Sequence, residues 1–541
     1  MQQAVCNFPP LRNFLVLSFS VPYLPLMNQP TATKSIWKVI AASSVGTLIE
    51  WYDFYIFGSL ATVIADQFFP KVNPTAALLS TLATFAAGFI VRPFGALVFG
   101  RLGDLIGRKY TFLLTLILMG GSTFAIGLVP GYASIGFAAP LIVLLLRLLQ
   151  GLALGGEYGG AATYVAEHSP PHKRGYYTSW IQTTATLGLF LSLGVILITR
   201  YMLDADPAES VRKFNDWGWR IPFWLSIVLV GVSIYIRLKM KESPLFSRIK
   251  AEGKISVNPL KESFGHKTNL KMVLLALFGA TMGQGVVWYT GQFYAQSFIE
   301  TVCRISFDQS RTMLLWGILF ATPFFIVFGS WSDRIGRKWI MLAGMLLAIS
   351  TYHVIFSQFQ SLSDPAVRTE ITEKRKVLST TTTPVAENSQ QLVRTTISEV
   401  HFTDGAVFKE TRTDTVQAGN ATPLSAPKIT WHDKQLDTSS YWKFVALIFV
   451  LVLYVTMVYG PIAAFLVELF PTRIRYTSMS LPYHIGNGVF GGLTPFIALL
   501  LTTIYVDDKL SGLWYPIIVA GVCTVIGAVY ISNRIDPDVN D

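Results

Sequence analysis

Charged residues are scarce in this chain of 541 residues, of which 14% are charged and 52% are hydrophobic. A soluble globular protein carries about 25% charged residues, so this composition argues against a soluble fold. Cysteine is also scarce, with Cys6, Cys303 and Cys523 as its three positions. They form no CxxC pair and no metal-ligand spacing, and we therefore expect neither a disulfide nor a metal site.

Several enzyme motifs are missing as well. The sequence contains no Walker A, no HExxH and no GxSxG, which removes three common signatures of nucleotide, zinc and acyl-transfer chemistry. A Gly-x-Gly-x-x-Gly pattern occurs at 486–491. It lies in an apolar run with no preceding strand, so helix packing explains it better than dinucleotide binding. We expect neither an enzyme nor a bound cofactor.

The positive charge of the chain lies mainly in short segments. The net charge of +11 could suggest a nucleic-acid partner, but the basic residues gather in turns between long apolar runs. That is the positive-inside pattern of cytoplasmic loops in membrane proteins. The predicted surroundings are therefore a lipid bilayer, and nucleic acid is not expected as a partner.

Twelve apolar runs each approach the roughly 20 residues that cross a hydrocarbon core. They cover 37–64, 75–100, 110–129, 138–167, 175–200, 219–238, 271–299, 312–331, 339–357, 441–469, 477–504 and 512–532. With this even number the basic turns all fall on one face of the membrane. The charge pattern thus predicts that both termini are cytoplasmic.

The runs divide the chain into two six-helix bundles, one over 36–238 and one made of 271–357 and 441–535. Three segments lie outside them. We expect 1–35 to be a disordered N-terminal extension and 239–270 to be a cytoplasmic connector.

Segment 361–440 is rich in Thr and Ser and is placed outside the cell by the run count. Alternation around 400–409 suggests strands, and Asp404-Gly405 suits a hairpin turn. We expect a small β-rich extracytoplasmic insertion between the ninth and tenth helices.

A charged, glycine-punctuated turn occurs twice, at Gly100–Tyr110 and again at Gly329–Trp339. Both copies have the form Gly-x-x-x-Asp-x-x-Gly-Arg-Lys, which suggests that one half of the chain repeats the other. This turn resembles the signature loop of the major facilitator superfamily. Arg147-Leu-Leu-Gln150-Gly151 and Glu242-Ser-Pro244 resemble two further signatures of that superfamily. The resemblance implies an all-α membrane fold of twelve helices in two pseudo-symmetric bundles.

Narrower motifs resemble the metabolite:proton symporter family, whose members carry α-ketoglutarate, citrate, shikimate, proline and betaine. They are Glu50-Trp-Tyr-Asp53-Phe54, Arg92-Pro93-Phe94-Gly95, Gly155-Gly-Glu157-Tyr-Gly-Gly160, Pro471-Thr-Arg473-Ile-Arg475-Tyr476 and Ser480-Leu-Pro-Tyr-His484-Ile-Gly-Asn487-Gly488. This resemblance implies a secondary transporter of the bacterial inner membrane that takes up a small carboxylate-bearing or zwitterionic metabolite together with a proton. We expect it to act as a monomer.

Ionisable residues inside a span are expensive and are therefore functional candidates. Glu50 and Asp53 lie three residues apart in the first run, and Arg147 and Glu157 lie ten apart in the fourth. Burial favours a protonated carboxyl group, whereas a nearby Arg favours the charged form. A substrate that engages the Arg would free the carboxylate to take up a proton. We assign these four residues to proton coupling; the alternative is a set of structural salt bridges.

A second group of residues has the chemistry to hold the substrate. Arg92 matches a carboxylate with its two-pronged guanidinium group, and Arg147 could do the same or act as a counter-ion. The seventh and eleventh runs add polar and aromatic side chains suited to a binding pocket; these are Gln284, Trp288, Tyr289, Gln292, Tyr483, His484 and Asn487. The alternative is that they join helices to each other. Gly283, Gly285 and Gly291 could unwind the seventh helix.

The repeated turns are better read as gates than as binding sites. Each turn carries an Asp and an Arg, and a Glu follows at the equivalent place of each half. The predicted cytoplasmic gate is Asp104, Arg108 and Glu167 in the first half, and Asp333, Arg337 and Glu468 in the second. We expect each Glu to pair with the Arg of its own half and to release it on the inward swing. The alternative is a basic loop that only fixes topology.

Other functions stay open at this level. An uncoupled facilitator would have the same spans, and a carrier-like sensor could use 361–440 to bind a ligand or partner. A proton-driven drug exporter fits less well, because exporters carry a Gly/Pro-rich signature in the fifth helix and 183–199 has no proline.

Overall fold

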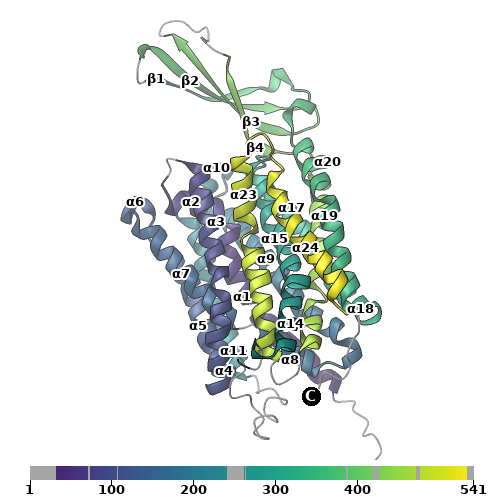
Figure 1. The fold of residues 1–541 in the computed structure, drawn as a ribbon. Helices are drawn as coiled ribbons and strands as arrows, with labels where there is room; N and C mark the ends of the chain where they lie inside the picture. The colour runs from purple at the N-terminus through teal and green to yellow at the C-terminus, as the bar shows by residue number, and fades with distance from the viewer. Residues whose placement is uncertain are drawn as a thin grey trace, which may run out of the picture.

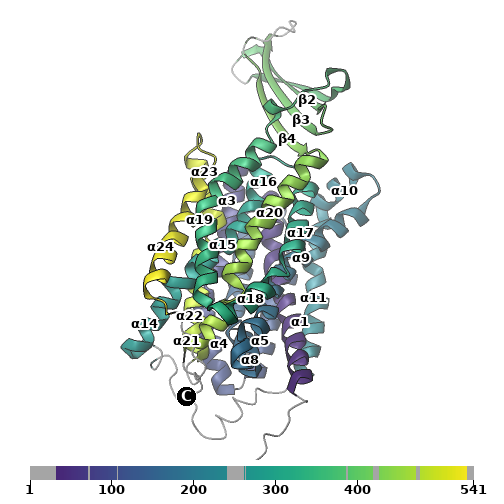
Figure 2. The same cartoon turned by 90° about the vertical axis from the view of Figure 1, so that its right-hand side faces the viewer.

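The computed structural model describes residues 32–532 except 71–72, 107, 157, 240–260, 262–263, 386–387, 418–423, 425 and 471–474. It consists of a long helical bundle with a β-sheet standing beyond one end (Figure 1). The start of α1 (Ala32–Ser59) lies at the end of the bundle opposite the sheet (Figure 2). We call the end that carries the sheet the outer end and the opposite end the inner end.

The helices of the first half pack mainly on one another. They are α1, α2 (Ala61–Phe68), α3 (Pro74–Ile90), α4 (Arg92–Ile106), α5 (Arg108–Ile126), α6 (Tyr132–Ile135), α7 (Ala138–Gly155), α8 (Tyr158–His168), α9 (Arg174–Leu203), α10 (Pro207–Lys213) and α11 (Arg220–Lys239). Packing of α1 on α9 and of α5 on α7 and α11 holds this half together.

The second half has the same kind of packing, with α20 between α17 and α19. Its helices are α14 (Lys267–Ala276), α15 (Met282–Tyr289), α16 (Ala295–Thr301), α17 (Phe307–Ala321), α18 (Phe324–Ile335), α19 (Arg337–Leu362), α20 (Thr438–Tyr459), α21 (Ile462–Leu469), α22 (Arg475–Tyr483), α23 (Thr494–Ile504) and α24 (Trp514–Tyr530). Turns of π-helix interrupt it; they are η3 (Leu277–Thr281), η4 (Thr290–Tyr294) and η7 (His484–Gly491).

Among the described residues nine helices are long and apolar enough to cross a membrane, and two bent pairs raise this number to eleven. The first pair bends by 61° between Ser59 and Ala61, and the second by 58° between Gly218 and Arg220. A shorter apolar helix, Leu113–Ile126, overlaps the run expected at 110–129. Each of the twelve expected runs therefore overlaps a described apolar helix. The eighth of these helices, Phe307–Ile335, is longer than the apolar run expected at 312–331.

The span Lys267–Thr301 stays helical across its glycines. Gly285 permits close packing: a Cβ atom there would lie 2.5 Å from the carbonyl oxygen of Gly486 in η7. The span is therefore tightly packed at this point rather than unwound.

The sheet has four antiparallel strands in the order β1 (Lys376–Val385), β2 (Asn388–His401), β3 (Val407–Gln417) and β4 (Lys428–Gln435). The predicted hairpin turn at Asp404-Gly405 joins β2 to β3, and Gly405 has a φ of 92°. Val400, Phe402 and Phe408 are buried near the base of the sheet. The expected β-rich insertion is thus confirmed.

Backbone hydrogen bonds join the base of the sheet to the second half. The amide of Lys434 in β4 donates to the carbonyl oxygen of Arg304 at 2.9 Å, and the amide of Ser306 donates back to the Lys434 carbonyl oxygen at 2.9 Å. The Gln309 side chain donates to the carbonyl oxygen of Leu436 at 3.0 Å and accepts from its amide at 2.8 Å. The sheet is therefore paired with the loop between α16 and α17.

Candidate functional site

Two arginines lie buried among aromatic rings in the middle of the bundle. Arg92, at the start of α4, is 1% exposed, and Arg147 in α7 is 0% exposed. The guanidinium carbon of each lies 4.2 Å from the ring centre of Phe54. That of Arg92 also lies 3.9 Å from the ring centre of Phe89. Such rings stabilise a cation through their faces, which explains how the apolar core holds two positive charges.

The hydrogen-bonding capacity of these arginines is only partly used. Arg147 Nη1 donates to Gln150 Oε1 and, at 3.4 Å, to the carbonyl oxygen of Phe54. Among the described residues, Nε and Nη2 of both Arg92 and Arg147 have no hydrogen-bond partner. A buried donor of a charged group without an acceptor costs about 1–3 kcal/mol or more. The site therefore offers unfilled donors suited to an anion.

Glu50 and Asp53 are both buried in α1 but have different neighbours. Glu50 lines a small cavity with Arg92, Tyr483 and His484. This cavity is about 10 Å³, roughly the space of one water. The Asp53 side chain lies towards α5, where its Oδ2 is 3.3 Å from the position a Cβ atom would take at Gly120. The structure brings Glu50, but not Asp53, to the cavity beside Arg92.

The second half faces this centre with aromatic and amide side chains. The ring of Trp288 in α15 stacks on Tyr55 of α1 at 5.1 Å, and Tyr289 meets Phe89 of α3 edge-on at 5.0 Å. Both polar atoms of the buried Gln292 amide lack a hydrogen-bond partner in the described part of the chain. These side chains therefore form the wall between the two halves.

A chain of hydrogen bonds links the predicted pocket residues of α15, α22 and η7. Gln284 Nε2 donates to Asn487 Oδ1 at 3.2 Å, and Asn487 Nδ2 donates to the hydroxyl of Tyr483 at 3.3 Å. That hydroxyl lies 2.8 Å from the hydroxyl of Tyr459. Gln284, Tyr483 and Asn487 are thus committed partly to each other.

The inner end of the second half contains the predicted trio of gate residues in contact. Arg337 Nη1 lies 2.7 Å from Asp333 Oδ1, and Arg337 Nη2 lies 3.0 Å from Glu468 Oε1. The Asp333 carboxylate also accepts from the amides of Gly175 and Tyr176, at 2.9 and 2.8 Å. These amides begin α9 of the first half, where a helix N-terminus favours negative charge. Asp333 therefore links the two halves.

Three of the residues predicted for the gate and for proton coupling fall wholly or partly outside the described structure. Glu157 lies outside the described residues, as do the side chains of Asp104 and Arg108. Glu167 Oε1 lies 3.5 Å from Arg475 Nη1 of the second half. This contact joins the two halves, whereas the expected partner of Glu167 was Arg108 of its own half.

A polar cluster that sequence reasoning missed joins the halves nearer the outer end. The fully buried Arg311 in α17 donates to Glu300 Oε1 at 2.5 Å and to the carbonyl oxygen of Ser59 at 2.6 Å. Gln296 Nε2 donates to the same carbonyl oxygen at 3.3 Å. Ser59 ends α1 at the 61° bend. The available signal is the charge of Arg311, but this residue stands just before the apolar run that begins at 312.

Comparison with known proteins agrees with this architecture. The sugar (and other) transporter family matches residues 38–256. The inner membrane metabolite transport protein YhjE of Escherichia coli is 32% identical over 477 residues, which are 86% of this chain and 88% of that protein. The alpha-ketoglutarate permease of Escherichia coli is 35% identical over 336 residues, 61% of this chain and 74% of the permease.

The fold resembles that of the xylose transporter XylE from Escherichia coli. The two structures share a TM-score of 0.60 at 16% identity, over 93% of this chain and 99% of XylE. Its relatives and apolar helices make the protein a multi-pass transporter of the inner membrane, not an enzyme. The chain belongs to the major facilitator superfamily, among the bacterial metabolite transporters of its sugar (and other) transporter family.

Proposed function

We propose that the protein takes up a small carboxylate-bearing metabolite together with a proton, by alternating access of two six-helix halves. In this proposal it acts as a monomer, with both termini in the cytoplasm and the sheet outside. The observation that carries the proposal is the pair of buried arginines, Arg92 and Arg147, with unfilled donors between aromatic rings.

A substrate carboxylate would satisfy these donors. The planar guanidinium group binds the two oxygens of a carboxylate side by side, which fixes both position and orientation. The aromatic faces of Phe54 and Phe89 stabilise the positive charge while the site is empty. An apolar solute would leave the donors unfilled, so the same geometry disfavours it.

The position of Glu50 supplies a route to proton coupling. Glu50 and Arg92 line the same small cavity, and a nearby cation favours the charged form of a carboxyl group. Once the substrate carboxylate engages Arg92, that stabilisation of Glu50 weakens and protonation becomes favourable. Proton and substrate binding thereby assist each other, as symport requires. His484 lines the cavity too and is the second candidate for the proton.

The relatives support the substrate class and the coupling. One is an alpha-ketoglutarate permease, whose substrate is a dicarboxylate. The structural neighbour XylE is a proton:xylose symporter. Positive turns gather on the face we assign to the cytoplasm, as they do in other membrane proteins.

The test uses the purified protein in liposomes with an imposed pH gradient, acidic outside, and radiolabelled α-ketoglutarate or glycine betaine as the solute. The proposal expects accumulation above the outside concentration for at least one of them. Accumulation should disappear when a proton ionophore collapses the gradient. Uptake that is unchanged in the presence of the ionophore would contradict proton coupling and indicate a facilitator.

Glu50→Gln separates coupling from binding in the same assay. Because Gln cannot take up a proton, this variant should lose gradient-driven accumulation by more than about tenfold but keep exchange of internal for external solute. Glu373→Gln, an exposed acid beside the sheet, is the control and should behave like the unsubstituted protein. Full accumulation by Glu50→Gln would exclude Glu50 as the coupling residue.

A further inference from the structure

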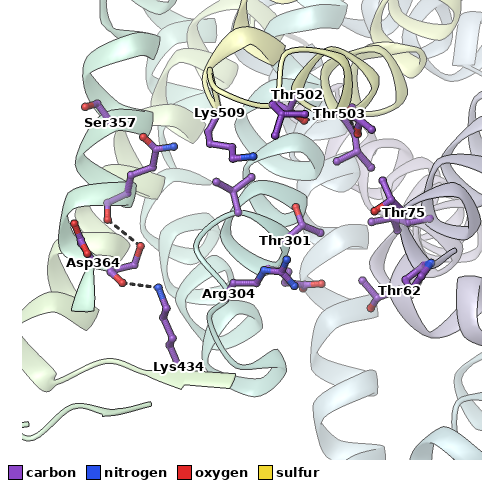
Figure 3. A pocket seen from close by; sticks show the side chains of 18 of the residues that line it. Thr62, Thr75, Thr301, Arg304, Ser357, Asp364, Lys434, Thr502, Thr503 and Lys509 are labelled. Atoms are coloured by element: carbon purple, nitrogen blue, oxygen red, sulfur yellow. Dashed lines mark hydrogen bonds between the residues drawn. The ribbon is translucent and has the colours of Figure 1, made fainter. Parts of the chain in front are cut away.

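A large cavity opens at the outer end of the bundle beneath the sheet (Figure 3). Its volume is about 1030 Å³. Thr62 and Thr75 line it from the first half, Thr301 and Thr502 from the second, and Lys434 from β4. We call this cavity the outer vestibule. Because both halves contribute to its walls, it lies where a solute would enter between them.

A second cavity, of only about 20 Å³, adjoins the vestibule. The two share Thr62, Leu78 and Glu300, and the smaller one reaches Phe85 and Phe293. Phe85 packs against Phe54, the ring between the two central arginines. The vestibule thus lies next to a small cavity whose wall includes Phe85, a ring in contact with the proposed binding site.

The charges that line the vestibule do not balance. Arg304 and Lys509 are exposed and extend towards the same space from opposite sides (Figure 3). In the described part of the chain neither makes an ion pair. The Glu300 carboxylate pairs with Arg311 at 2.5 Å, whereas Asp364 keeps its charge and accepts from the amide of Ala366 at 2.9 Å. The lining thus holds three cations, Arg304, Lys434 and Lys509, against two acids. Its net charge is therefore positive.

Arg304 is held in place by the sheet. It has a φ of 60°, in the left-handed region that is unfavourable for a residue with a side chain. Its carbonyl oxygen accepts from the amide of Lys434, which keeps this conformation. Strained positions of this kind tend to gather where function requires a particular geometry. The insertion therefore helps to position the backbone of Arg304.

Lys434 has a different role from the two exposed cations. Its Nζ donates to the carbonyl oxygen of Ser363 at 2.7 Å, and burial lowers the pKa of this amine. Its charge is directed at the protein backbone, so Arg304 and Lys509 are the cations available to a solute.

We propose that the outer vestibule is an extracytoplasmic capture site for anionic carboxylates, with Arg304 and Lys509 as its cations and β4 as part of its wall. This proposal rests on the proposed function for the transported solute and narrows it: a net anion is favoured over a zwitterion. A cleft lined by one sign of charge concentrates ions of the opposite sign and raises their association rate.

The potential of the vestibule can be measured without any substrate. In the full-length protein, a cysteine at Thr503→Cys, an exposed vestibule position, is labelled with an anionic and with a cationic methanethiosulfonate reagent. Thr382→Cys on β1 is the surface control, and the protein without an added cysteine is the blank. At low salt the anionic-to-cationic rate ratio should be at least about fourfold higher at Thr503→Cys than at the control.

Neutralising the cations should remove this preference. Adding Arg304→Gln and Lys509→Gln to Thr503→Cys should bring the ratio to that of the surface control. Lys428→Gln, which removes an exposed lysine from β4 away from the vestibule, should leave the ratio unchanged. Equal ratios at the two cysteines in the unsubstituted background would overturn the proposal, and so would a preference that survives the double neutralisation.

Uptake measurements test the capture role itself. In liposomes at low salt, Arg304→Gln with Lys509→Gln should raise the KM for α-ketoglutarate about fourfold and leave kcat unchanged, because the steering acts before the central site. The difference should shrink at high salt. An unchanged KM would overturn capture. If the unsubstituted protein transports no carboxylate, the proposed function fails, while the labelling ratio still decides whether the vestibule concentrates anions.

Discussion

At the level of single residues, carboxylate binding as proposed depends on the shape of a guanidinium group as much as on its charge. Arg92 lies between Phe54 and Phe89, with two of its donor atoms unfilled within the described structure. An ammonium group is a compact point charge and lacks the planar fork of arginine. A lysine at this position would keep the charge but would not hold a carboxylate in the same orientation.

Arg92→Lys should therefore lower kcat/KM for the transported carboxylate by more than about tenfold, since a bidentate charged contact is worth roughly 1.5–3 kcal/mol. Uptake into liposomes measures this effect. The control is Arg212→Lys, an exposed arginine of α10 that pairs with Glu209 at 2.6 Å. Near-normal uptake by Arg92→Lys would show that only the charge matters, and would contradict the proposed binding geometry.

At the scale of helices and strands, sequence patterns predict those structural features that depend on residues close together in the chain. Each apolar run overlaps a helix because hydrophobic length is a local property of the chain. The hairpin at Asp404-Gly405 was predictable because a glycine there can adopt a positive φ. The bend after Ser59 was not, since its carbonyl oxygen is satisfied by Arg311, which lies far along the chain.

Some features of the candidate site were likewise predictable from the sequence, and others were not. Arg92 and Glu50 were recognisable as ionisable residues in apolar runs, and the structure places them on one cavity. That Asp53 has other neighbours depends on how α5 packs, which no local pattern reports. The vestibule could not be predicted either, because Arg304, Lys434 and Lys509 come from three segments that are distant in sequence.

The close contact of α15 with η7 gives a prediction about packing. A methyl group at Gly285 would lie 2.5 Å from the Gly486 carbonyl oxygen. Gly285→Ala should therefore lower the thermal midpoint in detergent, because overpacking costs about 1–3 kcal/mol. Gly194→Ala in α9 is the matched control, since nothing lies within 4 Å of its added methyl group. Equal midpoints for the two variants would contradict the packing described here.

At the scale of the whole molecule, contacts at both ends join the halves. At the inner end Asp333 accepts from two amides of α9, and Glu167 approaches Arg475. Towards the outer end, Arg311 reaches the Ser59 carbonyl oxygen. In the proposed alternating-access mechanism, such contacts at one end break while those at the other form. We therefore expect each set to contribute to the balance between inward-facing and outward-facing states.

Asp333→Asn should shift this balance towards the state that is open at the inner end. The substitution removes the charge that holds two amides and Arg337, and a charge-assisted hydrogen bond is worth about 1.5–3 kcal/mol. A tenfold or greater change in the ratio of states follows. Spin labels at Lys173→Cys and Arg334→Cys, exposed on opposite halves, report the inner distance. An unchanged distance distribution would show that Asp333 does not act as a gate.

Proton symport as proposed requires that carboxylate and proton cross the membrane together. Its most direct test uses liposomes with no initial pH difference, a trapped pH-sensitive dye and α-ketoglutarate added outside. We expect the interior to acidify when the solute is added, and not to acidify with Glu50→Gln or with empty liposomes. Entry of the radiolabelled solute through the unsubstituted protein without acidification would contradict proton symport.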